Sequence, residues 1–284
     1  MYPYADYDVY LTLSSWDGDP QFAAPVQGEK NGDSVVYRVS GVRAFALAAL
    51  YDFKQVTQTD EGVTYTVNYQ TVSEQIAQKA LATMRESVHL YAQMFGPYPF
   101  DSLTMTELEM FDGMEFDAQF FLSKVWFHTY DGTPKNNLVL LTAHETAHNW
   151  WFSQVGNDQA FDPWLDEALC VYSELLYLEA YHPELVDWWW DFRVYNFEPA
   201  GPVNVSIYDF VQYENYRQAV YLRGAEFIQA VRDVLGDGQF FTFLQHYLAE
   251  GHGKVMSTED FFRILGEINP EAAETLQGLY FGDW

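Results

Sequence analysis

The stretch His144-Glu145-Thr146-Ala147-His148 decides how this chain is interpreted, because it has the pattern H-E-x-x-H. On a helix, positions i and i+4 share a face, so His144 and His148 can bind one metal ion. Glu145 lies one step round the helix, close enough to reach a water at that metal. Glu167, nineteen positions after His148, can supply a third ligand. Two histidines and a glutamate form the ligand set of a hydrolytic zinc site, which predicts a metal-dependent peptidase.

The residues around this motif favour a real metal site over a chance match. The apolar run Leu138-Val139-Leu140-Leu141 precedes it and Asn149-Trp150-Trp151-Phe152 follows it, which is typical of a buried helix. Buried histidine and glutamate side chains need a partner or a metal. In the competing interpretation, His144 and His148 are core histidines with satisfied hydrogen bonds and Glu167 is a surface carboxylate.

Two further motifs accompany the histidine pair. Gly113-Met114-Glu115-Phe116 lies upstream and Tyr221-Leu222-Arg223-Gly224-Ala225 lies downstream. In this order, and with eighteen residues between His148 and Glu167, the motifs resemble those of the zinc aminopeptidase family that includes aminopeptidase N and leukotriene hydrolase. The upstream motif is similar to the family's Gly-x-Met-Glu-Asn exopeptidase motif, and the downstream one to the segment that brings its catalytic tyrosine. The resemblance spans roughly residues 70 to 270.

The chain departs from the family pattern in two ways. Asp112 stands at the first glycine of the exopeptidase motif, and Phe116 stands where asparagine or tyrosine is usual. These two differences concern the shape of the first substrate pocket, whereas Glu115 is kept. The second departure is length, because family members continue into a helical C-terminal domain, which we expect to be absent here.

The resemblance also implies how the site would work. One Zn²⁺ per chain is expected on the three ligands, where it polarises the scissile carbonyl. Glu145 is expected to be the general base that takes the proton of the attacking water. Tyr221 is expected to donate its hydroxyl to the oxyanion, and Tyr216 could share its pocket. The competing interpretation of Tyr221 is a core tyrosine.

Glu115 is the residue that we expect to make the enzyme specific for substrates with a free N-terminus. An exopeptidase must recognise a free α-ammonium group, and a buried carboxylate does so through a charge-assisted hydrogen bond. Gly113 and Met114 are expected to offer backbone groups to the substrate. An endopeptidase has no use for this carboxylate, and in the competing interpretation Glu115 only caps a strand.

The metal histidines also need an acceptor for their second ring nitrogen. Glu174 is the candidate, because it lies seven residues after Glu167 on the same helix face. Asp166 is the alternative.

Composition narrows the classes of partner. The chain has 284 residues and a net charge of −27, which argues against nucleic acid and anionic membranes as partners. No apolar run is long enough for a transmembrane segment, and the N-terminus has no signal-peptide pattern. The single cysteine, Cys170, excludes an intrachain disulfide. The compartment stays unknown, and an extracytoplasmic location in a bacterium, as part of a longer precursor, is one of the open alternatives.

The order of expected elements predicts an α+β fold. Residues 1–70 have the alternation and turn signals of strands, and we interpret them as the C-terminal part of an N-terminal β domain. Residues 71–284 are expected to form a thermolysin-like zinc metallopeptidase domain. Helices are expected at about 73–95, 139–155, 167–181, 184–192, 216–235, 238–250 and 257–267, with stops at Gly236, Gly251 and Gly266.

These observations predict a zinc-dependent aminopeptidase that acts on peptides with a free N-terminus. Two alternatives stay open: a gluzincin endopeptidase, and a truncated zinc-binding module that binds peptides with little activity. Without the C-terminal domain the cleft is expected to be unusually open, unless self-association or the missing domain covers it. Exposed apolar surface would mark the position of that cover.

Overall fold

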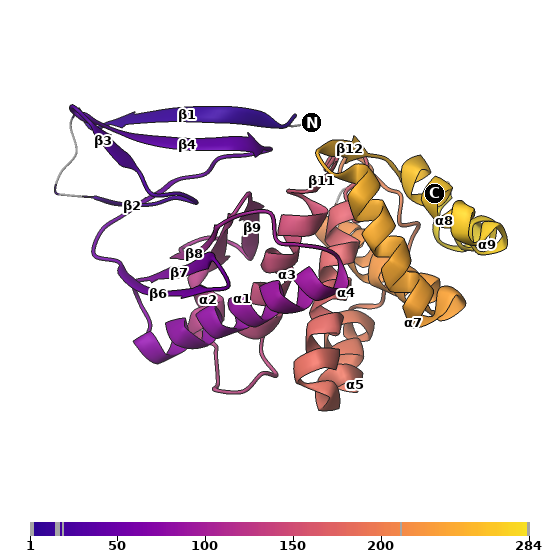
Figure 1. Ribbon diagram of the computed structural model, residues 1–284. Helices are drawn as coiled ribbons and strands as arrows, with labels where there is room; N and C mark the ends of the chain where they lie inside the picture. The colour runs from indigo at the N-terminus through magenta and orange to yellow at the C-terminus, as the bar shows by residue number, and fades with distance from the viewer. Residues whose placement is uncertain (1–2, 15–17, 19, 211, 283–284) are drawn as a thin grey trace. The chain divides into compact units, whose positions relative to one another are not determined.

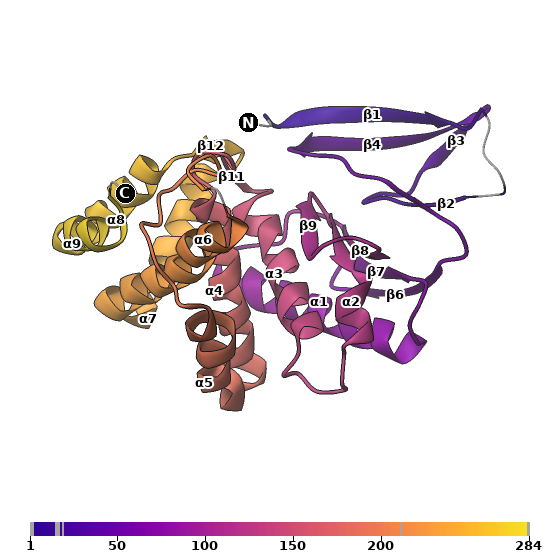
Figure 2. The same ribbon diagram turned by 180° about the vertical axis from the view of Figure 1, so that it is seen from behind.

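A computed structural model describes residues 3–14, 18, 20–210 and 212–282 of the chain (Figures 1 and 2). The chain divides into two compact units, and each is described by itself. The first, here called the sheet unit, lies within residues 2–88 and 99–149. The second, the helical unit, lies within residues 89–98 and 150–284. Helices α1 (Glu74–Met94) and α3 (Asn137–Trp151) contribute residues to both.

The N-terminal strands of the sheet unit form two small sheets. Strand β4 (Ser34–Val42) pairs antiparallel with β1 (Ala5–Thr12) and β3 (Glu29–Asn31). Strands β2 (Gln21–Ala23) and β5 (Ala48–Leu50) pair antiparallel with each other. Side chains along β1 alternate between half-buried and exposed, as the period of two in its sequence predicts.

A five-stranded sheet forms the centre of the sheet unit. Its order is β6-β7-β8-β10-β9, in which β7, β8 and β10 run parallel and the two outer strands run antiparallel to their neighbours. Strand β9, which carries the exopeptidase-like motif, therefore lies at an edge. The bounds are β6 (Lys54–Asp60), β7 (Val63–Tyr69), β8 (Ser102–Leu108), β9 (Gly113–Phe116) and β10 (Gln119–Ser123).

Helices α1 and α3 lie on the same side of this sheet (Figure 1). One face of α1 is part of the core, because a set of its apolar side chains recurs every three or four residues and is at most 2% exposed: Ala77, Ala80, Leu81, Met84, Val88 and Tyr91. Helix α3 is buried on nearly all sides. The short α2 (Lys124–His128) begins at Ser123, whose hydroxyl accepts a hydrogen bond from the Val125 amide.

The helical unit is built around α4 (Trp164–Tyr181) and α7 (Gly224–Gly251). Rings from α4, α7, α8 (Thr258–Ile268) and the C-terminal residues meet edge to face, with centroids 4.9–5.5 Å apart for Trp164 and its three neighbours. The remaining elements are β11 (Val155–Asn157), η1 (Pro183–Leu185), α5 (Val186–Trp189), η2 (Trp190–Val194), η3 (Tyr195–Phe197), α6 (Tyr213–Arg217), η4 (Gln218–Arg223), β12 (Lys254–Met256) and α9 (Pro270–Tyr280).

The structure confirms the α+β fold class and most of the expected helices, with differences at the ends of two of them. The zinc helix ends at Trp151, because the chain turns there into β11. Gly236 marks the expected break, since its φ of 71° kinks α7. The expected stop at Gly266 is wrong: α8 continues to Ile268, and Asn269 then begins α9 by accepting the Ala272 amide with its side chain.

Two further expectations concern the chain as a whole. Strands β6 and β7 belong to the expected N-terminal domain by sequence, yet β7 pairs with β8 beyond it. The division at residues 70 and 71 stays a prediction. Among the residues that the structure describes, no helix combines the length and apolar character needed to cross a membrane.

Candidate active site

Helix α3 brings the two histidines of the motif onto one face. The Nε2 atoms of His144 and His148 lie 3.2 Å apart, and both side chains are almost fully buried. Two ring nitrogens that face one point at this separation fit a shared metal ion. Zinc–nitrogen bonds of about 2.0–2.1 Å would be long enough for both nitrogens to bind the same ion.

Asparagine side chains make polar contacts at both ends of α3. The Asn136 side chain accepts the Leu138 amide at the N-terminus, at 2.9 Å. Near the C-terminus, the Asn149 amide group donates to the Thr146 carbonyl, and its oxygen accepts the Ala118 amide beside β10. The contact with Ala118 joins the histidine helix to the start of β10.

Glu167 completes the expected ligand set. It lies in the first turn of α4, and its amide donates to the Asp166 side chain at 2.9 Å. One ligand atom from each of His144, His148 and Glu167 lies within 4.8 Å of the other two. Two neutral imidazoles and a carboxylate are the donor set of hydrolytic zinc sites, so these residues fit Zn²⁺.

A second group joins the helix to the edge strand of the sheet. Ligand atoms of Glu115, Glu145 and His148 lie within 4.8 Å of one another. Two carboxylates this close create a strongly negative position, which suits a cation such as an α-ammonium group. The structure therefore brings together the expected general base and the expected amine-binding residue.

Gly113 makes this arrangement sterically feasible. A Cβ atom at Gly113 would lie 2.0 Å from Oε1 of Glu145 and 2.6 Å from its Cδ. No real side chain tolerates such a distance, so the carboxylate of Glu145 occupies the space that any larger residue would need. The sequence indicated Gly113 only as a backbone contact for the substrate, and nothing in its pattern indicated this approach of helix to strand.

Tyr221 lies in a π-helical turn, η4, of the helical unit. Such turns are rare and often occur at functional sites. Burial raises the pKa of the Tyr221 hydroxyl well above its usual value, and the nearby Glu167 carboxylate, with which it shares a hydrogen bond, acts in the same direction. The ring of Tyr216 contacts Tyr221 edge to face at 5.8 Å. Tyr221 is therefore protonated at neutral pH and lies beside one of the expected metal ligands.

The two candidates for supporting the histidines have other partners. Glu174 is fully buried, and its carboxylate accepts hydrogen bonds from Trp189 Nε1 at 3.1 Å and from Arg193 at 2.9 Å. Asp166 accepts the side chain of Gln159 at 3.0 Å as well as the Glu167 amide. Their contact with a metal histidine stays a prediction.

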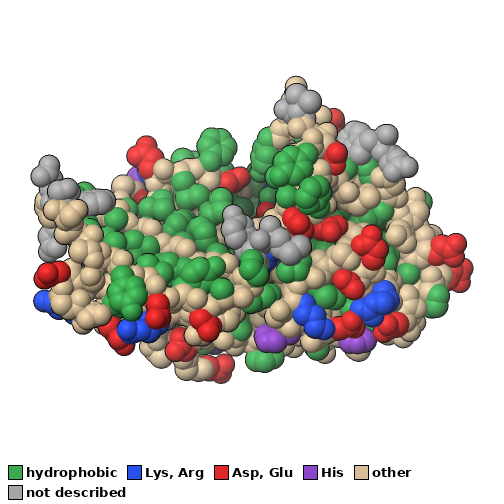
Figure 3. Space-filling model, turned by 90° about the horizontal axis from the view of Figure 1, so that it is seen from above, with side chains coloured by type: hydrophobic (Ala, Val, Ile, Leu, Met, Phe, Trp, Pro, Cys, Tyr) green, Lys and Arg blue, Asp and Glu red, His purple; other side chains and the backbone are tan. Residues whose placement is uncertain are grey.

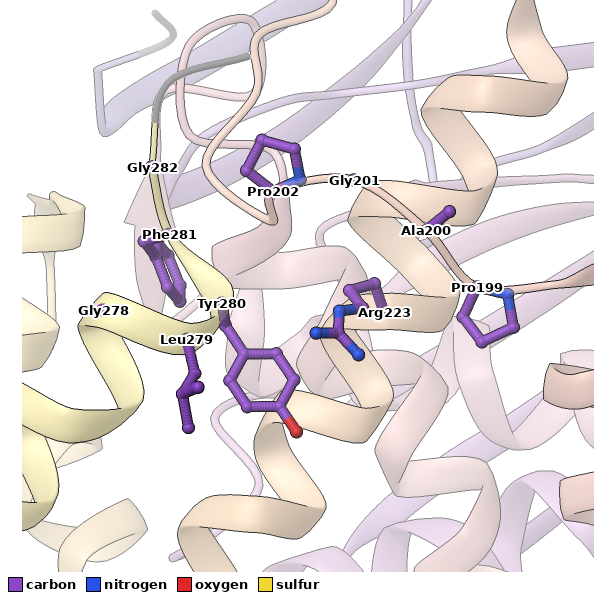
Figure 4. A pocket seen from close by; sticks show the side chains of 10 residues that line it. All are labelled: Pro199, Ala200, Gly201, Pro202, Arg223, Gly278, Leu279, Tyr280, Phe281 and Gly282. Carbon is purple, nitrogen blue, oxygen red and sulfur yellow. The ribbon is translucent and has the colours of Figure 1, made fainter.

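A separate pocket in the helical unit is shown in Figure 4. The Arg223 guanidinium lies 4.5 Å from the Tyr280 ring and also binds Glu226 at 2.9 Å. Within the described part of the chain, none of the expected site residues lines this pocket. Its lining residues are Pro199, Ala200, Gly201, Pro202, Arg223, Gly278, Leu279, Tyr280, Phe281 and Gly282.

Comparison with known proteins identifies the family and the fold of the chain. Residues 79–280 of the chain match the family model of the Peptidase family M1 domain. Aminopeptidase M1-D of Oryza sativa subsp. japonica is 24% identical over 265 residues, which cover 86% of this chain and 30% of the relative. Endoplasmic reticulum aminopeptidase 1 of Mus musculus is 25% identical over 153 residues, which cover 51% of this chain and 16% of the relative. The chain thus spans less than a third of the length of these relatives.

Solved structures share the fold. A two-domain M1 zinc metallopeptidase bound to L-arginine superposes with a TM-score of 0.70 at 21% identity, over 93% of this chain and 62% of that one. An M1 zinc metallopeptidase from Deinococcus radiodurans gives a TM-score of 0.65 at 20% identity, over 99% of this chain and 61% of that one.

Proposed function

Because the chain belongs to peptidase family M1, we propose that it is a zinc-dependent aminopeptidase that removes the N-terminal residue of peptides. The observation that carries the proposal is the clustering of Glu115 with Glu145 and His148. Hydrolysis requires the base Glu145 and the ligand His148, whereas a second carboxylate at this position is useful to an enzyme that binds the free amine of its substrate.

Zinc is the metal that the donor set favours. His144, His148 and Glu167 would hold the ion, which supplies Lewis-acid polarisation of the scissile carbonyl when it is bound. Three protein ligands leave one coordination position for water or substrate, as catalytic zinc sites require.

Glu145 acts as the proton carrier in this proposal. Its carboxylate lies beside His148 and is not one of the three expected metal ligands, so it can accept a proton from the attacking water. The same carboxyl group then returns the proton to the leaving amine. Gly113 leaves the space that the Glu145 carboxylate occupies beside β9.

Glu115 binds the substrate's α-ammonium group in the proposal. Strand β9 carries this residue at the edge of the sheet, antiparallel to β10. The backbone of Gly113 and Met114 on the same strand is placed to pair with an extended peptide, as edge strands do. The strand would therefore set both the register of the peptide and the position of its amine.

Tyr221 stabilises the oxyanion in the proposal. Its raised pKa keeps the hydroxyl protonated, so it can donate a hydrogen bond to the oxygen that becomes negative. One such donor is typically worth about 3 kcal/mol of transition-state stabilisation.

The comparison of leucine aminocoumarin with its N-acetyl derivative tests this function. The parent protein with one equivalent of zinc is expected to hydrolyse the free amine at least about a hundredfold faster in kcat/KM, because the acetyl group removes the charge that Glu115 binds. Glu115→Gln is expected to lose most of this preference while it retains its zinc. Equal rates on both substrates would indicate an endopeptidase, and zinc binding with no hydrolysis would indicate a peptide-binding module.

A further inference from the structure

The strand that carries Glu115 ends in a tight turn that is joined to the helix of the expected metal ligands. Strand β9 and its antiparallel partner β10 are connected by two residues, Asp117 and Ala118. The side-chain oxygen of Asn149, the residue that follows His148 on α3, accepts a hydrogen bond from the Ala118 amide at 3.2 Å. Helix α3 therefore contacts the turn of the hairpin directly, within the sheet unit.

This contact requires an amide group at position 149. Asn149 is 1% exposed, and its nitrogen donates to the Thr146 carbonyl at 3.0 Å while its oxygen accepts from Ala118. An ionised aspartate has no group to donate, and an aliphatic side chain would leave the buried Ala118 amide without this partner. Removal of the Asn149 amide group therefore weakens the hairpin turn itself.

Ala118 has a backbone conformation that depends on such contacts. Its φ is 55°, in the left-handed region that residues other than glycine, asparagine and aspartate rarely adopt. Its carbonyl accepts the Thr104 amide at 3.0 Å, and the Asp117 carboxylate accepts the amides of Arg43 and Ala44 at 3.1 and 2.8 Å. A conformation of this kind persists only where the surrounding structure holds it, and it often occurs at functional sites. The contact from α3 is one of those that hold it.

Glu115 lies close enough to the turn to depend on its position. It belongs to the second residue pair of the β9–β10 ladder, counted from the turn. One oxygen of its carboxylate lies within 4.8 Å of ligand atoms of Glu145 and His148, both on α3. A charge-assisted hydrogen bond to an ammonium group is about 2.7–2.9 Å long, so a displacement of the strand end by ~1 Å would weaken it.

We propose that Asn149 is a positioning residue for Glu115. Its hydrogen bond to Ala118 holds the β9–β10 hairpin at the distance from α3 at which Glu115 binds the α-ammonium group of the substrate. The proposal rests on the aminopeptidase function, and in it Asn149 acts only through the turn. Loss of Asn149 therefore reduces the selection of a free amine and leaves the zinc content unchanged.

The selection of the free amine is measured as the ratio of kcat/KM for leucine aminocoumarin to that for its N-acetyl derivative. Asn149→Ala, loaded with one zinc per chain, is expected to reduce this ratio about tenfold or more, because a buried donor at the turn loses its partner. Most of the loss should occur on the free amine, since the N-acetyl derivative has no charge for Glu115 to bind. A ratio equal to that of the parent protein would overturn the proposal.

Asn136→Ala is the matched control on the same helix. Asn136 lies just before α3, where its oxygen accepts the Leu138 amide and its nitrogen donates to the Thr129 carbonyl, both at 2.9 Å. The variant loses two hydrogen bonds of the same kind at the end of α3 remote from the hairpin, and its ratio is expected to stay within about twofold of the parent's. An equal fall in both variants would assign the effect to the stability of α3 and contradict the positioning role.

A glycine at position 118 provides a rescue that only a role through the turn predicts. Glycine adopts a positive φ without steric cost, so the turn can keep its conformation in the absence of Asn149. The double variant Asn149→Ala/Ala118→Gly is expected to have a ratio at least about threefold higher than that of Asn149→Ala. The same ratio in both would show that Asn149 acts in another way.

Asn149→Gln takes the place of Asn149→Ala if that variant does not fold or bind zinc. Its side chain is longer by one methylene group and reaches the turn only after the turn moves, so the ratio is expected to fall about threefold or more. An unchanged ratio in Asn149→Gln would count against the proposal.

Two outcomes concern the proposed function itself. Equal rates of the parent protein on both substrates would show that the free amine is not selected, and the proposal would fail together with the aminopeptidase function. If neither substrate is hydrolysed, the function fails alone, and calorimetric binding of L-leucinamide to the zinc-loaded proteins decides. Weaker binding to Asn149→Ala than to Asn136→Ala supports the positioning role, whereas equal binding or no binding overturns it.

Discussion

At the scale of single residues, the site depends on one contact that the motifs did not indicate. The spacing of His144, Glu145 and His148 was readable from the sequence, because helical periodicity alone places them on neighbouring faces. The contact between Gly113 and Glu145 was not, because it requires knowledge of how closely β9 approaches α3. Local sequence pattern therefore predicts which residues could form the site, whereas tertiary packing decides the orientation of the proposed base, Glu145.

Gly113→Ala tests this contact. The new methyl group must displace the Glu145 carboxylate, which is the flexible end of its side chain, so we expect a small change in stability and a large loss of turnover. A loss of about a hundredfold in kcat, with zinc content unchanged, is the expected result, since general-base catalysis contributes 10²–10⁴-fold. Gly238→Ala is the control, because an added Cβ meets nothing within 4 Å there. Near-normal kcat in Gly113→Ala would contradict the assigned role.

At the scale of secondary-structure elements, the sequence predicted the long helices better than the short ones. Helix α1 lies within one residue of both expected bounds, and α4 ends at the expected Tyr181 but begins three residues before Glu167, at Trp164. The π-helical turns η2 and η4 break the regular period and leave no pattern that a period of 3.6 would detect. Helix α9 was not expected, although Asn269-Pro270 is a start signal, because the apolar pattern before it had been ended at Gly266.

The turn η2 is connected to α4 by a buried ion pair, which gives a prediction for stability. Arg193 is 14% exposed at its side chain and makes two hydrogen bonds to fully buried Glu174. Removal of one partner leaves an uncompensated buried charge, so Arg193→Ala is expected to lower the free energy of unfolding by about 3–5 kcal/mol. Urea denaturation measures the change.

Arg263→Ala provides the comparison for this prediction. Arg263 pairs with Glu267 at 2.9 Å, but both side chains are about half exposed, and such pairs contribute about 1 kcal/mol or less. If the two variants have equal midpoints of denaturation, the Glu174–Arg193 pair does not stabilise the junction between η2 and α4.

At the scale of the whole molecule, the order of strands in the five-stranded sheet could not be predicted from the sequence. The edge position of β9 follows from long-range pairing, in which β10 lies between β8 and β9. The net charge, by contrast, follows directly from the amino-acid composition. Figure 3 shows that Asp and Glu side chains outnumber Lys and Arg on the face it presents, in agreement with a net charge of −27.

This excess of acidic groups predicts a dependence on salt. A negative field attracts cationic peptides and is screened as ionic strength rises, with a screening length of about 10 Å at 0.1 M. We expect kcat/KM for Leu-Arg-Arg-Ala to fall several-fold between 0.01 M and 0.5 M sodium chloride, while that for Leu-Ala-Ala-Ala changes little. The same salt response for both peptides would show that the field does not steer substrates.

The most direct test of the central claim compares the parent protein with Glu145→Gln in one assay of zinc content and leucine aminocoumarin hydrolysis. The parent is expected to hold one zinc per chain and to hydrolyse the substrate. Glu145→Gln is expected to hold the same zinc and to lose at least about a hundredfold in kcat, because the amide cannot accept the proton. Equal turnover in the two proteins, or hydrolysis by a parent protein stripped of zinc, would contradict a zinc aminopeptidase with Glu145 as its base.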